Sequence, residues 1–557
     1  MDAFRSRQVL TNNSRERLLR AAHGVHTAPQ MRSRPLIGSL LLLPLLGCND
    51  NTPSYPAIII YENPQSPSGV GNTGNVGSGN TGNTSSYGGS GNSSGGGSNG
   101  GGSSTGLYGH CEQPWSEPVP VGKVECDMDA LTDGGVLTGD VSADRTLTSG
   151  HSYLIKGGVR VMPGVTLTIE PCVKLIGENS DAILAVLSGG VGDPVNNCFY
   201  SGGEPAPGGK LIAVGEPMAP IVFTSAKPKG QRKPGDWGGV ILMGNAQNNL
   251  ALSEDGVSGV QVPIEGLLRN ECHGWPTDKF NDESSGELKY VRIEYASKQL
   301  VKDSETNGLS LGSLGRGTKL HYIMVSNSGD DCFEWFGGAA NADHLIALNC
   351  DDDMFDADNG FSGHVQFLFG RQYFTTTEVD SRGFEIDGAP NQVYQPRTSA
   401  QFSNFTLCGG GLKDTSVFRD GAVMRNLAEN VKLLNGFITG FAGSGVYVMK
   451  NDSEGARMNF VDVFGNTKGL MAGADVSNGK DGAAQDWFFN QDGDTTADPD
   501  RFCNCWADPP VAVPGTPSKG ETPTGFDDES AQYMGAFKDP SADSNWMRGA
   551  WVDWSAQ

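Results

Sequence analysis

Three short segments between Asn327 and Asp387 repeat one pattern, and their spacing constrains the fold more than any other feature of the chain. Each contains a Phe followed by a carboxylate, and the pairs are Phe333-Glu334, Phe355-Asp356 and Phe384-Glu385. The first two pairs lie 22 residues apart, with aspartates at matching positions before both. Such a step is typical of one coil of a β-solenoid, in which equivalent residues stack. The pattern predicts a ladder of buried Phe side chains beside an outward-facing column of carboxylates.

Apolar residues elsewhere in the chain alternate with polar ones in short runs. Val165–Ile169, Tyr290–Tyr295 and Leu320–Val325 are examples, and Gly, Pro or Asn separates the runs. Alternation with a period of two predicts strands with one buried face. Aligning Ile323 with Leu345 keeps apolar residues in phase with the 22-residue step. The strands are short and numerous, with loops of unequal length, which favours an all-β fold of the parallel β-helix type over a sandwich.

One dipeptide predicts a different connection. Asn435-Gly436 lies between the apolar residues Leu434 and Phe437, and Asn-Gly is a strong signal for a two-residue hairpin turn. A hairpin here would join two antiparallel strands and would interrupt the parallel solenoid.

The N-terminal region has the features of an export signal. Residues 1–30 are interpreted as an upstream extension, and after Met31 two arginines precede an apolar run from Leu36 to Leu46. A basic segment followed by a short apolar run is typical of a secretory signal. The run is too short to span a bilayer, which needs about 20 apolar residues. Because the segment 31–48 ends in Leu-Leu-Gly-Cys, it resembles a lipoprotein lipobox, and the resemblance implies a lipid anchor on Cys48 that attaches the chain to a membrane.

The predicted β-helix, residues 108–475, lies between two segments of different composition. Residues 49–107 are rich in Gly, Ser and Asn, so they cannot bury apolar surface and are interpreted as a disordered tether. Residues 476–557 are rich in Asp, Pro and Gly and contain several Trp residues. We expect them to form a loop-rich cap over the end of the solenoid, where unpaired strand edges would otherwise invite aggregation. Together these segments predict an exported lipoprotein held at the outer membrane or the cell surface.

The charge and the cysteine content fit this location. The formal net charge is -24, which argues against nucleic acid or an anionic membrane surface as a partner, because both require a basic face. Setting Cys48 aside leaves an even number of cysteines, and an even number in an exported chain predicts disulfides. None shows the C-x-x-C spacing of a structural zinc site, and the spacing does not give the pairing.

An ordered series of motifs resembles a bacterial family of secreted or lipid-anchored proteins. The series comprises Pro220–Ser225, Pro234–Gly239, Leu288–Glu294, Asn307–Leu311, Gly329–Asp331 and Asp351–Asp353, within residues 130–470. Members of this family look like pectin-lyase-type right-handed β-helices. The resemblance implies a right-handed single-stranded parallel β-helix and a surface location, and it implies no particular activity.

The aspartates also resemble those of the polygalacturonase-type glycoside hydrolases, which share this fold. On that resemblance the candidate catalytic residues are Asp330, Asp331, Asp352, Asp353, Asp356 and His364. Inversion at a sugar requires an acid and a base about 6.5–9.5 Å apart. Carboxylates on adjacent coils, about 4.8 Å apart, would raise the pKa of one of them and allow this division of roles. A polysaccharide hydrolase or lyase is therefore one candidate function.

A bound cation is a second explanation for the same column. Stacked carboxylates repel one another unless they are protonated or bridged by a cation, and calcium takes six to eight oxygen ligands. The residues predicted to share one or two calcium ions are Asp331, Asp353, Asp356, Asp358, Glu385 and Asp387. A further candidate is the acidic run Asn490–Asp500, which lacks the Gly and the distal Glu of an EF-hand.

A third interpretation is a non-catalytic scaffold or adhesin that binds a polysaccharide or a cell-surface glycan. An aromatic ring can stack on a sugar, and an Arg guanidinium can hold a sugar carboxylate. The candidates for these contacts are Trp335, Arg371 and Arg382. The alternative for the aromatic residue is burial in the core. Binding or structural duty is favoured over catalysis.

Overall fold

The chain divides into a unit of residues 1–99 and a unit of residues 100–557. The computed structural model describes part of the second unit, and the described residues are 126–190, 198, 204–251, 261–267, 271–301, 304–372, 381–388, 394–410, 418–426, 428–448, 456–464, 466, 470–472, 519–538 and 546–554. The predicted signal segment, Cys48, the tether and the run Asn490–Asp500 lie outside them. No helix in the described ranges is long and apolar enough to cross a membrane.

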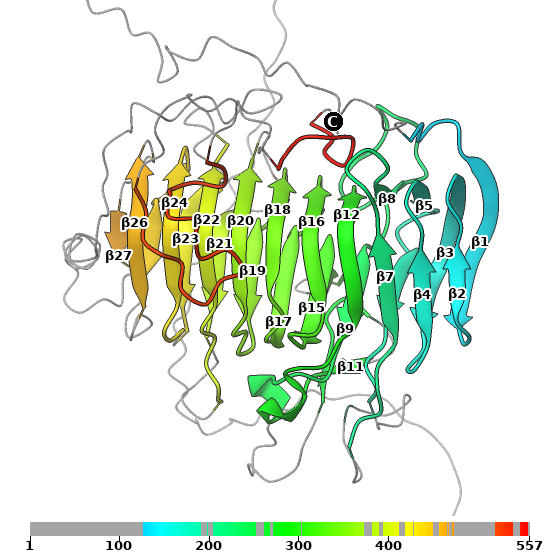
Figure 1. Ribbon diagram of the computed structural model, residues 1–557, viewed down its shortest axis with the longest axis horizontal. Coiled ribbons are helices and arrows are strands. Elements are labelled where there is room, and N and C mark those ends of the chain that lie inside the picture. The colour runs from blue at the N-terminus through cyan, green and yellow to red at the C-terminus, as the bar shows by residue number, and fades with distance from the viewer. Residues whose placement is uncertain are drawn as a thin grey trace, which may run out of the picture. The chain divides into compact units, whose positions relative to one another are not determined.

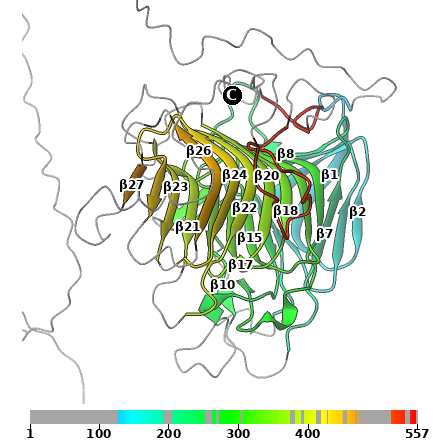
Figure 2. The same cartoon turned by 60° about the vertical axis from the view of Figure 1, so that its left-hand side comes forward.

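Parallel pairing joins 23 strands of the described residues into one continuous sheet. Strands that are neighbours in the sheet come from successive coils of the chain, so the sheet winds into the predicted right-handed parallel β-helix (Figures 1 and 2). Each coil therefore hydrogen-bonds through its backbone to the coils before and after it. This arrangement explains why the apolar runs are short, since each run lines only one side of a coil.

The solenoid has three sides. The first coils comprise β1 (Thr132–Val141), β2 (Arg145–Leu147), β3 (His151–Val161), β4 (Thr166–Ile169), β5 (Val173–Gly177), β6 (Ile183–Val186), β7 (Lys210–Val214), β8 (Ile221–Ser225) and β9 (Val240–Met243). The long strands β1 and β3 each run along two of the sides, whereas the coils of β4–β6 and β7–β9 have one strand on each side. Two of these sides then merge, because β12 (Gly286–Glu294) pairs with both β7 and β8. The merged strands that follow are β16 (Lys319–Ser326), β18 (Ala342–Leu348), β20 (His364–Arg371), β22 (Gln401–Cys408), β24 (Lys432–Thr439) and β26 (Arg457–Phe464).

The third side of the solenoid carries the candidate site. It continues from β6 and β9 through β15 (Leu309–Leu314), β17 (Phe333–Gly338), β19 (Phe355–Asp358), β21 (Ser381–Asp387), β23 (Phe418–Arg425), β25 (Val446–Val448) and β27 (Leu470–Ala472). The connections between coils hold β10 (Val262–Pro263), β11 (Cys272–His273), β13 (Lys298–Val301), β14 (Ser304–Thr306) and two 3-10 helices, η1 (Asn249–Ala251) and η2 (Asp278–Phe280).

Each merged strand bends at one residue whose backbone is left-handed. The residues at this bend are Tyr290, Tyr322, His344, Phe367, Asn404, Asn435 and Phe460, with φ between 50° and 61°. The rings at the first four of these positions lie against one another from coil to coil, and the ring centroids of Tyr322 and His344 are 4.2 Å apart. The predicted hairpin at Asn435-Gly436 is wrong, because both residues lie inside β24. Asn tolerates a positive φ, and here it supplies that conformation to the bend of a continuous strand.

The Phe ladder is confirmed. Phe333 pairs with Phe355, and Phe355 pairs with Phe384, in consecutive parallel strands. All three rings are fully buried, and the centroid distances along the ladder are 5.4 Å and 5.7 Å. The alignment of Ile323 with Leu345 also holds in the register of β16 and β18. Equivalent positions of successive coils thus form one continuous apolar interior.

Disulfides are present, as the cysteine content predicted. They join Cys126 to Cys172, Cys198 to Cys272, and Cys332 to Cys350. The third links the turn before β17 to the turn before β19, which are the two turns that carry the paired aspartates. The positions of those aspartates are therefore held by a covalent bond as well as by the sheet.

The described C-terminal residues, 519–538 and 546–554, form what we term the strap. The strap is the described part of residues 476–557, which we expect to form a loop-rich cap, and it lies along the side of the solenoid, across the merged strands (Figure 1). Trp551 of the strap packs on Met324 and Ile346 in an apolar cluster. Asn404, at the bend, donates a hydrogen bond of 2.6 Å to the carbonyl oxygen of Tyr533. The outward-facing rings at the bend require such a cover, because they would otherwise leave an apolar stripe in water.

Candidate metal centre

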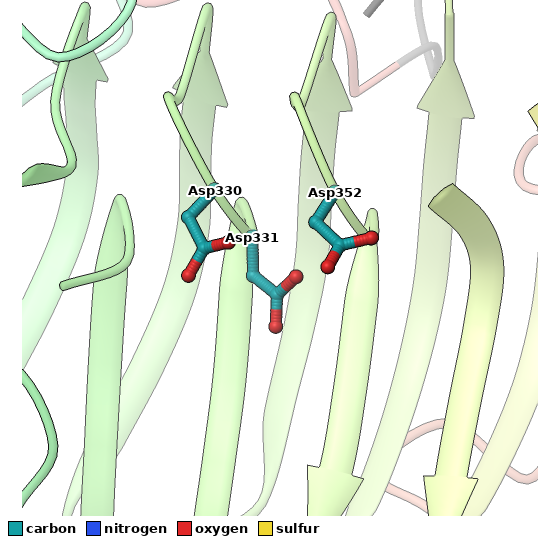
Figure 3. Close-up of side chains that lie close together, drawn as sticks. All are labelled: Asp330, Asp331 and Asp352. Atoms are coloured by element: carbon teal, nitrogen blue, oxygen red, sulfur yellow. The ribbon is translucent and has the colours of Figure 1, made fainter. Parts of the chain in front are cut away.

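Two equivalent turns of adjacent coils bring four aspartates together. Asp330 and Asp331 precede β17, and Asp352 and Asp353 precede β19. The backbone amide of Asp353 donates a hydrogen bond of 2.8 Å to Oδ1 of Asp331, so the two turns are in direct contact. Figure 3 shows Asp330 and Asp352 at matching places, with the carboxylate of Asp331 between them. In the structure these four residues therefore pair between adjacent coils, as their spacing predicts.

A column of carboxylates runs along the strands that follow these turns. Glu334, Asp356 and Glu385 occupy paired positions in β17, β19 and β21. They alternate with the inward Phe residues and so lie on the outer surface of the sheet. The column was expected to face solvent, yet Asp331 is 6% exposed and Glu334 is 7% exposed. The outer surface of this sheet is covered in part by the connections between coils, as where Ile264 packs on neighbouring apolar residues.

Burial and mutual repulsion dominate the electrostatics of the cluster. Burial first, and then the neighbouring carboxylates, raises the pKa of Asp330, Asp331, Glu334, Asp356 and Asp358 well above the ordinary values. In chemical terms these groups hold a proton or another cation more strongly than free carboxylates do.

The oxygen atoms of the cluster form two groups of the size that one ion needs. One group contains Asp331, Glu334 and Asp356, and the other contains Asp330, Asp331 and Asp352. Within each group one carboxylate oxygen from every residue lies within 4.8 Å of the others. Oxygens that each lie about 2.4 Å from a calcium ion can be no more than about 4.8 Å apart, so both groups fit. Asp331 belongs to both.

Several buried oxygens beside the cluster have no hydrogen-bond partner. They include Oδ1 of Asp356, Oδ1 of Asp358 and Oδ1 of Asn307. The Asn307 side chain is 1% exposed, and its amide nitrogen donates a hydrogen bond to Glu334. Its carbonyl oxygen belongs to the same small planar group and therefore borders the cluster. Buried oxygens without a donor are rare in folded proteins, and a bound cation can take the place of a missing donor.

Glu385 and Asp387, two of the predicted metal ligands, are ion-paired. Arg425 contacts both, with a distance of 3.0 Å between its Nε and Oδ2 of Asp387. Arg382 pairs with Glu385 and lies 3.6 Å from Asp353. Arg382 was proposed as a clamp for a sugar carboxylate, whereas its guanidinium is buried and engaged by the carboxylates of the protein itself.

Three other candidate residues lie apart from the carboxylates. Trp335 points into the core, is 1% exposed and stacks on Phe361. His364 begins β20, on another side of the solenoid, and its Nδ1 lies 2.5 Å from the carbonyl oxygen of Gly525 in the strap. Arg371 is also buried and lies over the ring of Trp554 at 5.3 Å. None of the three is placed to act on a ligand held by the aspartates.

Three residues at the site, Glu334, Asn307 and Arg425, were not among the predicted site residues. Glu334 could have been found, since it precedes Asp356 by the same 22-residue step as Phe333 precedes Phe355. Asn307 lies in the connection before β15 and carries no repeat signal. Arg425 pairs with Asp387 at a separation of 38 residues, which the shorter step does not predict.

The ion pairs of Arg382 provide a test of the electrostatics. Arg382→Ala is expected to reduce the free energy of unfolding by about 3 kcal/mol, because it leaves buried carboxylates without their countercharge. Arg382→Ala combined with Glu385→Gln is expected to lose less than the single variant. The control is Arg316→Ala, whose partner Asp282 is exposed, and its loss should stay below about 1 kcal/mol. Equal losses in urea unfolding at both positions would contradict a buried network.

Comparison with known proteins assigns the family. The family model described as a pectate-lyase like beta helix domain matches residues 139–478, which is more than half of the chain. The chain belongs to this family. No curated protein matches it. The family explains the solenoid and leaves the role of the acidic cluster to be argued from its geometry.

Three solved structures are similar in part, all at low identity. Tailspike protein 2 of an Escherichia coli bacteriophage matches at 11% identity and a TM-score of 0.22, over 63% of this chain and 38% of the tailspike, so the chain spans well under half of that protein. PfbA, a surface adhesin of Streptococcus pneumoniae, matches at 8% identity and a TM-score of 0.23. The match covers 58% of this chain and 84% of PfbA. A family 28 exopolygalacturonase of Yersinia enterocolitica matches at 10% identity and a TM-score of 0.14. The match covers 63% of this chain and 72% of the exopolygalacturonase.

Proposed function

We propose that this chain is an exported, lipid-anchored β-helix protein of the cell surface that binds calcium in the acidic cluster and serves a binding or structural role. The observation that carries the calcium site is the close grouping of Asp331, Glu334 and Asp356, whose oxygens lie within 4.8 Å of one another. The unpartnered carbonyl oxygen of Asn307 beside them supports it independently. All of these ligands are hard oxygen atoms, the type that calcium prefers.

The ion would join neighbouring coils. Asp331 and Glu334 come from the coil of β17, Asp356 comes from the coil of β19, and Asn307 precedes β15. A cation bound by these residues would replace repulsion between coils by attraction. Calcium is abundant outside cells, whereas the carboxylates would be forced to keep protons if no cation were present. The site is therefore suited to stabilising the solenoid after export.

Hydrolysis of a polysaccharide is the alternative that this geometry supports less well. A general acid and a general base must reach the glycosidic bond of a bound sugar. Of the candidate carboxylates, Asp331 and Asp353 are almost fully buried, and the other three are half-buried, so none of them is freely exposed to a polymer. The candidate His364 contributes to contacts with the strap instead.

Calorimetric titration of calcium into the EDTA-treated chain tests the proposed site. We expect one or two calcium ions per chain, and weak or absent binding in Asp331→Asn, because Asp331 belongs to both oxygen groups. Asp140→Asn, at an exposed position of β1, is the matched control and should bind as the parent chain does. Absence of binding at millimolar calcium would exclude the site.

The proposed anchor is tested at Cys48, which lies outside the described residues. Cys48→Ser is expected to move the exported chain from the membrane fraction to the soluble fraction, because the lipid chains on this residue would provide the membrane attachment. The measurement is the distribution of the chain after cell fractionation, together with incorporation of labelled fatty acid. A Cys48→Ser chain that stays with the membrane would exclude this anchor.

A further inference from the structure

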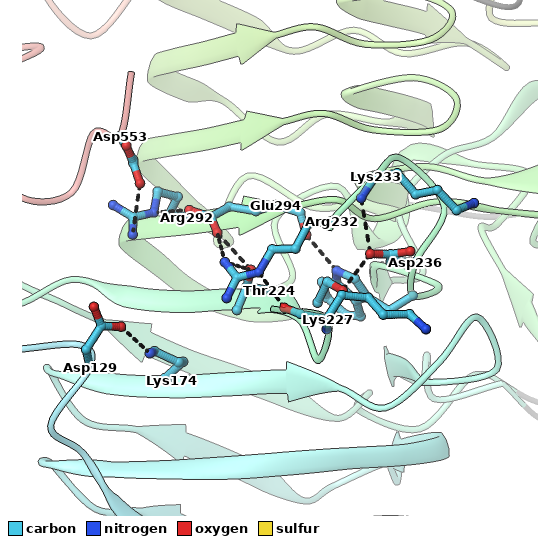
Figure 4. A network of polar contacts seen from close by, with 12 residues as sticks. Asp129, Lys174, Thr224, Lys227, Arg232, Lys233, Asp236, Arg292, Glu294 and Asp553 are labelled. Atoms are coloured by element: carbon cyan, nitrogen blue, oxygen red, sulfur yellow. Dashed lines mark hydrogen bonds and ion pairs between the residues drawn. The ribbon is translucent and has the colours of Figure 1, made fainter. Parts of the chain in front are cut away.

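A second polar site lies away from the acidic cluster, against the strands β5, β8 and β12. It is a pocket of about 670 Å³, and the strap forms one of its walls through Ala550, Val552 and Asp553. A pocket of this size holds a small ligand. Figure 4 shows its charged side chains, with Glu294 between Arg292 and Arg232, and Lys174 on a neighbouring strand.

Glu294 fixes the two guanidinium groups at the floor of the pocket. Its Oε1 lies 2.5 Å from Nε of Arg292, and its Oε2 lies 3.8 Å from Nη1 of Arg232. The hydroxyl group of Thr224 donates a hydrogen bond of 2.8 Å to the same carboxylate. Arg292 also donates to the carbonyl oxygen of Ala550 in the strap at 2.9 Å. These contacts hold the donors of the pocket in place before any ligand enters.

The register of the sheet places a third cation beside them. Lys174 pairs with Val222, and Val222 pairs with Arg292, so the three residues form one outward row on β5, β8 and β12. Lys174 and Arg292 are thus two strand spacings apart, about 10 Å between backbones. Val222 lies between them in the lining of the pocket.

The interior of this pocket is positively charged although the chain as a whole is acidic. Lys174, Arg232 and Arg292 stand against the single buried carboxylate of Glu294. The ion-pair partner of Lys174 is Asp129, whose side chain is fully exposed and 3.5 Å away, so solvent weakens that pair. The other charged residues of the lining lie at the rim: Asp127, Asp129 and Lys229 are exposed, and Asp553 is half-buried, with its Oδ2 4.0 Å from Nη2 of Arg292. An anion would therefore find net positive charge inside and hydrogen-bond acceptors at the entrance.

We propose that this pocket binds a hydroxylated carboxylate, that is, a carboxylate group on a carbon skeleton that bears several hydroxyl groups. The carboxylate would lie between Lys174 and the guanidinium groups, in charge-assisted hydrogen bonds. The hydroxyl groups would donate to the rim carboxylates and to Thr224, which an inorganic anion could not do. Such a ligand comes from two sources, the acidic sugar units of a glycan and free hydroxy acids. The inference is independent of the proposed calcium site.

Calorimetric titration of the purified chain with four probes tests this inference. We expect glucuronate or tartrate to bind, and we expect glucose, which lacks the carboxylate, and acetate, which lacks the hydroxyl groups, to bind about tenfold more weakly or worse. A preference for glucuronate assigns the sugar source, and a preference for tartrate assigns the free acid. Glucose binding as tightly as glucuronate, acetate binding as tightly as both acids, or no binding of either acid would overturn the proposal.

Variants locate the binding in this pocket. Lys174→Met keeps the apolar stem of the side chain and is expected to weaken binding of the preferred acid about tenfold. The matched control is Lys156→Met. Lys156 lies on β3, outside the pocket, and forms an exposed ion pair with Glu178. The thermal unfolding midpoint of both variants reports that they are folded. Equal affinity in Lys174→Met and the parent chain, or an equal loss in Lys156→Met, would overturn the assignment.

Discussion

Removing calcium with EDTA is expected to lower the midpoint of thermal unfolding at pH 8 by several degrees, up to about 8 °C. A ligand that binds only the folded state stabilises it by about 4 kcal/mol when its concentration is a thousand times its dissociation constant, and for a chain of this size each kcal/mol changes the midpoint by about 2 °C or less. The measurement is differential scanning calorimetry with calcium and with EDTA. An unchanged midpoint would contradict a structural calcium site.

The pH dependence of this effect has a definite sign. The pKa values of Asp331, Glu334 and Asp356 are raised in the folded state, so the folded chain binds more protons than the unfolded chain above about pH 4. Without calcium, stability therefore falls as the pH rises from about 4 towards the raised pKa values. The effect of EDTA is expected to be larger at pH 8 than at pH 5. The opposite order would contradict the electrostatic account of the cluster.

The variant Asp331→Asn distinguishes the stabilising effect of the ion from the destabilising repulsion between the buried carboxylates. This variant is expected to lose most of the response to calcium, because Asp331 belongs to both oxygen groups. In EDTA it is expected to be more stable than the parent chain, since one of the repelling buried charges is gone. Asp140→Asn, at its exposed position, should leave both midpoints unchanged. A variant that keeps the full calcium response would exclude Asp331 as a ligand.

Phe355→Ala is expected to reduce the free energy of unfolding by about 4 kcal/mol. The ring of Phe355 is fully buried between Phe333 and Phe384, so its removal opens a cavity that the stacked coils cannot close without breaking the register on both sides. Urea unfolding measures the loss. Phe355→Leu, which fills part of the space, should lose less.

The control for the ladder is an exposed apolar side chain. Val136 on β1 is 49% exposed, and Val136→Ala is expected to change the free energy of unfolding by no more than about 0.5 kcal/mol. A loss at Phe355 as small as that at Val136 would show that the ladder does not stabilise the solenoid.

The sequence predicts the first step of the ladder because the same 22-residue spacing holds on two sides of one coil, for Ile323 and Leu345 as well as for the two Phe residues. Phe333 and Phe355 lie one 22-residue step apart and pair in the sheet. The next coils are longer, so that Phe384 pairs with Ala422 at a separation of 38 residues. Where the coil length varies, the spacing in the sequence no longer tells which residues stack, and Arg425 could not be assigned to the acidic cluster.

The burial of the carboxylates depends on parts of the chain that carry no repeat. The direction of Glu334 and Asp356 follows from alternation with Phe333 and Phe355. The low exposure of Glu334 arises from connections between coils, whose paths have no periodic signal. The bend at Asn435 shows the same limit, because a positive φ serves a hairpin turn and a bent strand equally well. Local residue preferences thus specify a backbone conformation, but they do not specify whether that conformation belongs to a turn or to a continuous strand.

The most direct test is to locate the ion in crystals of the chain grown with calcium chloride. Anomalous difference density collected at a long wavelength identifies calcium independently of the refined atoms. We expect a peak about 2.3–2.6 Å from carboxylate oxygens of Asp331, Glu334 and Asp356. Fully occupied crystals with no peak among these oxygens, or with hydrogen-bonded protonated carboxyl groups in its place, would contradict this expectation.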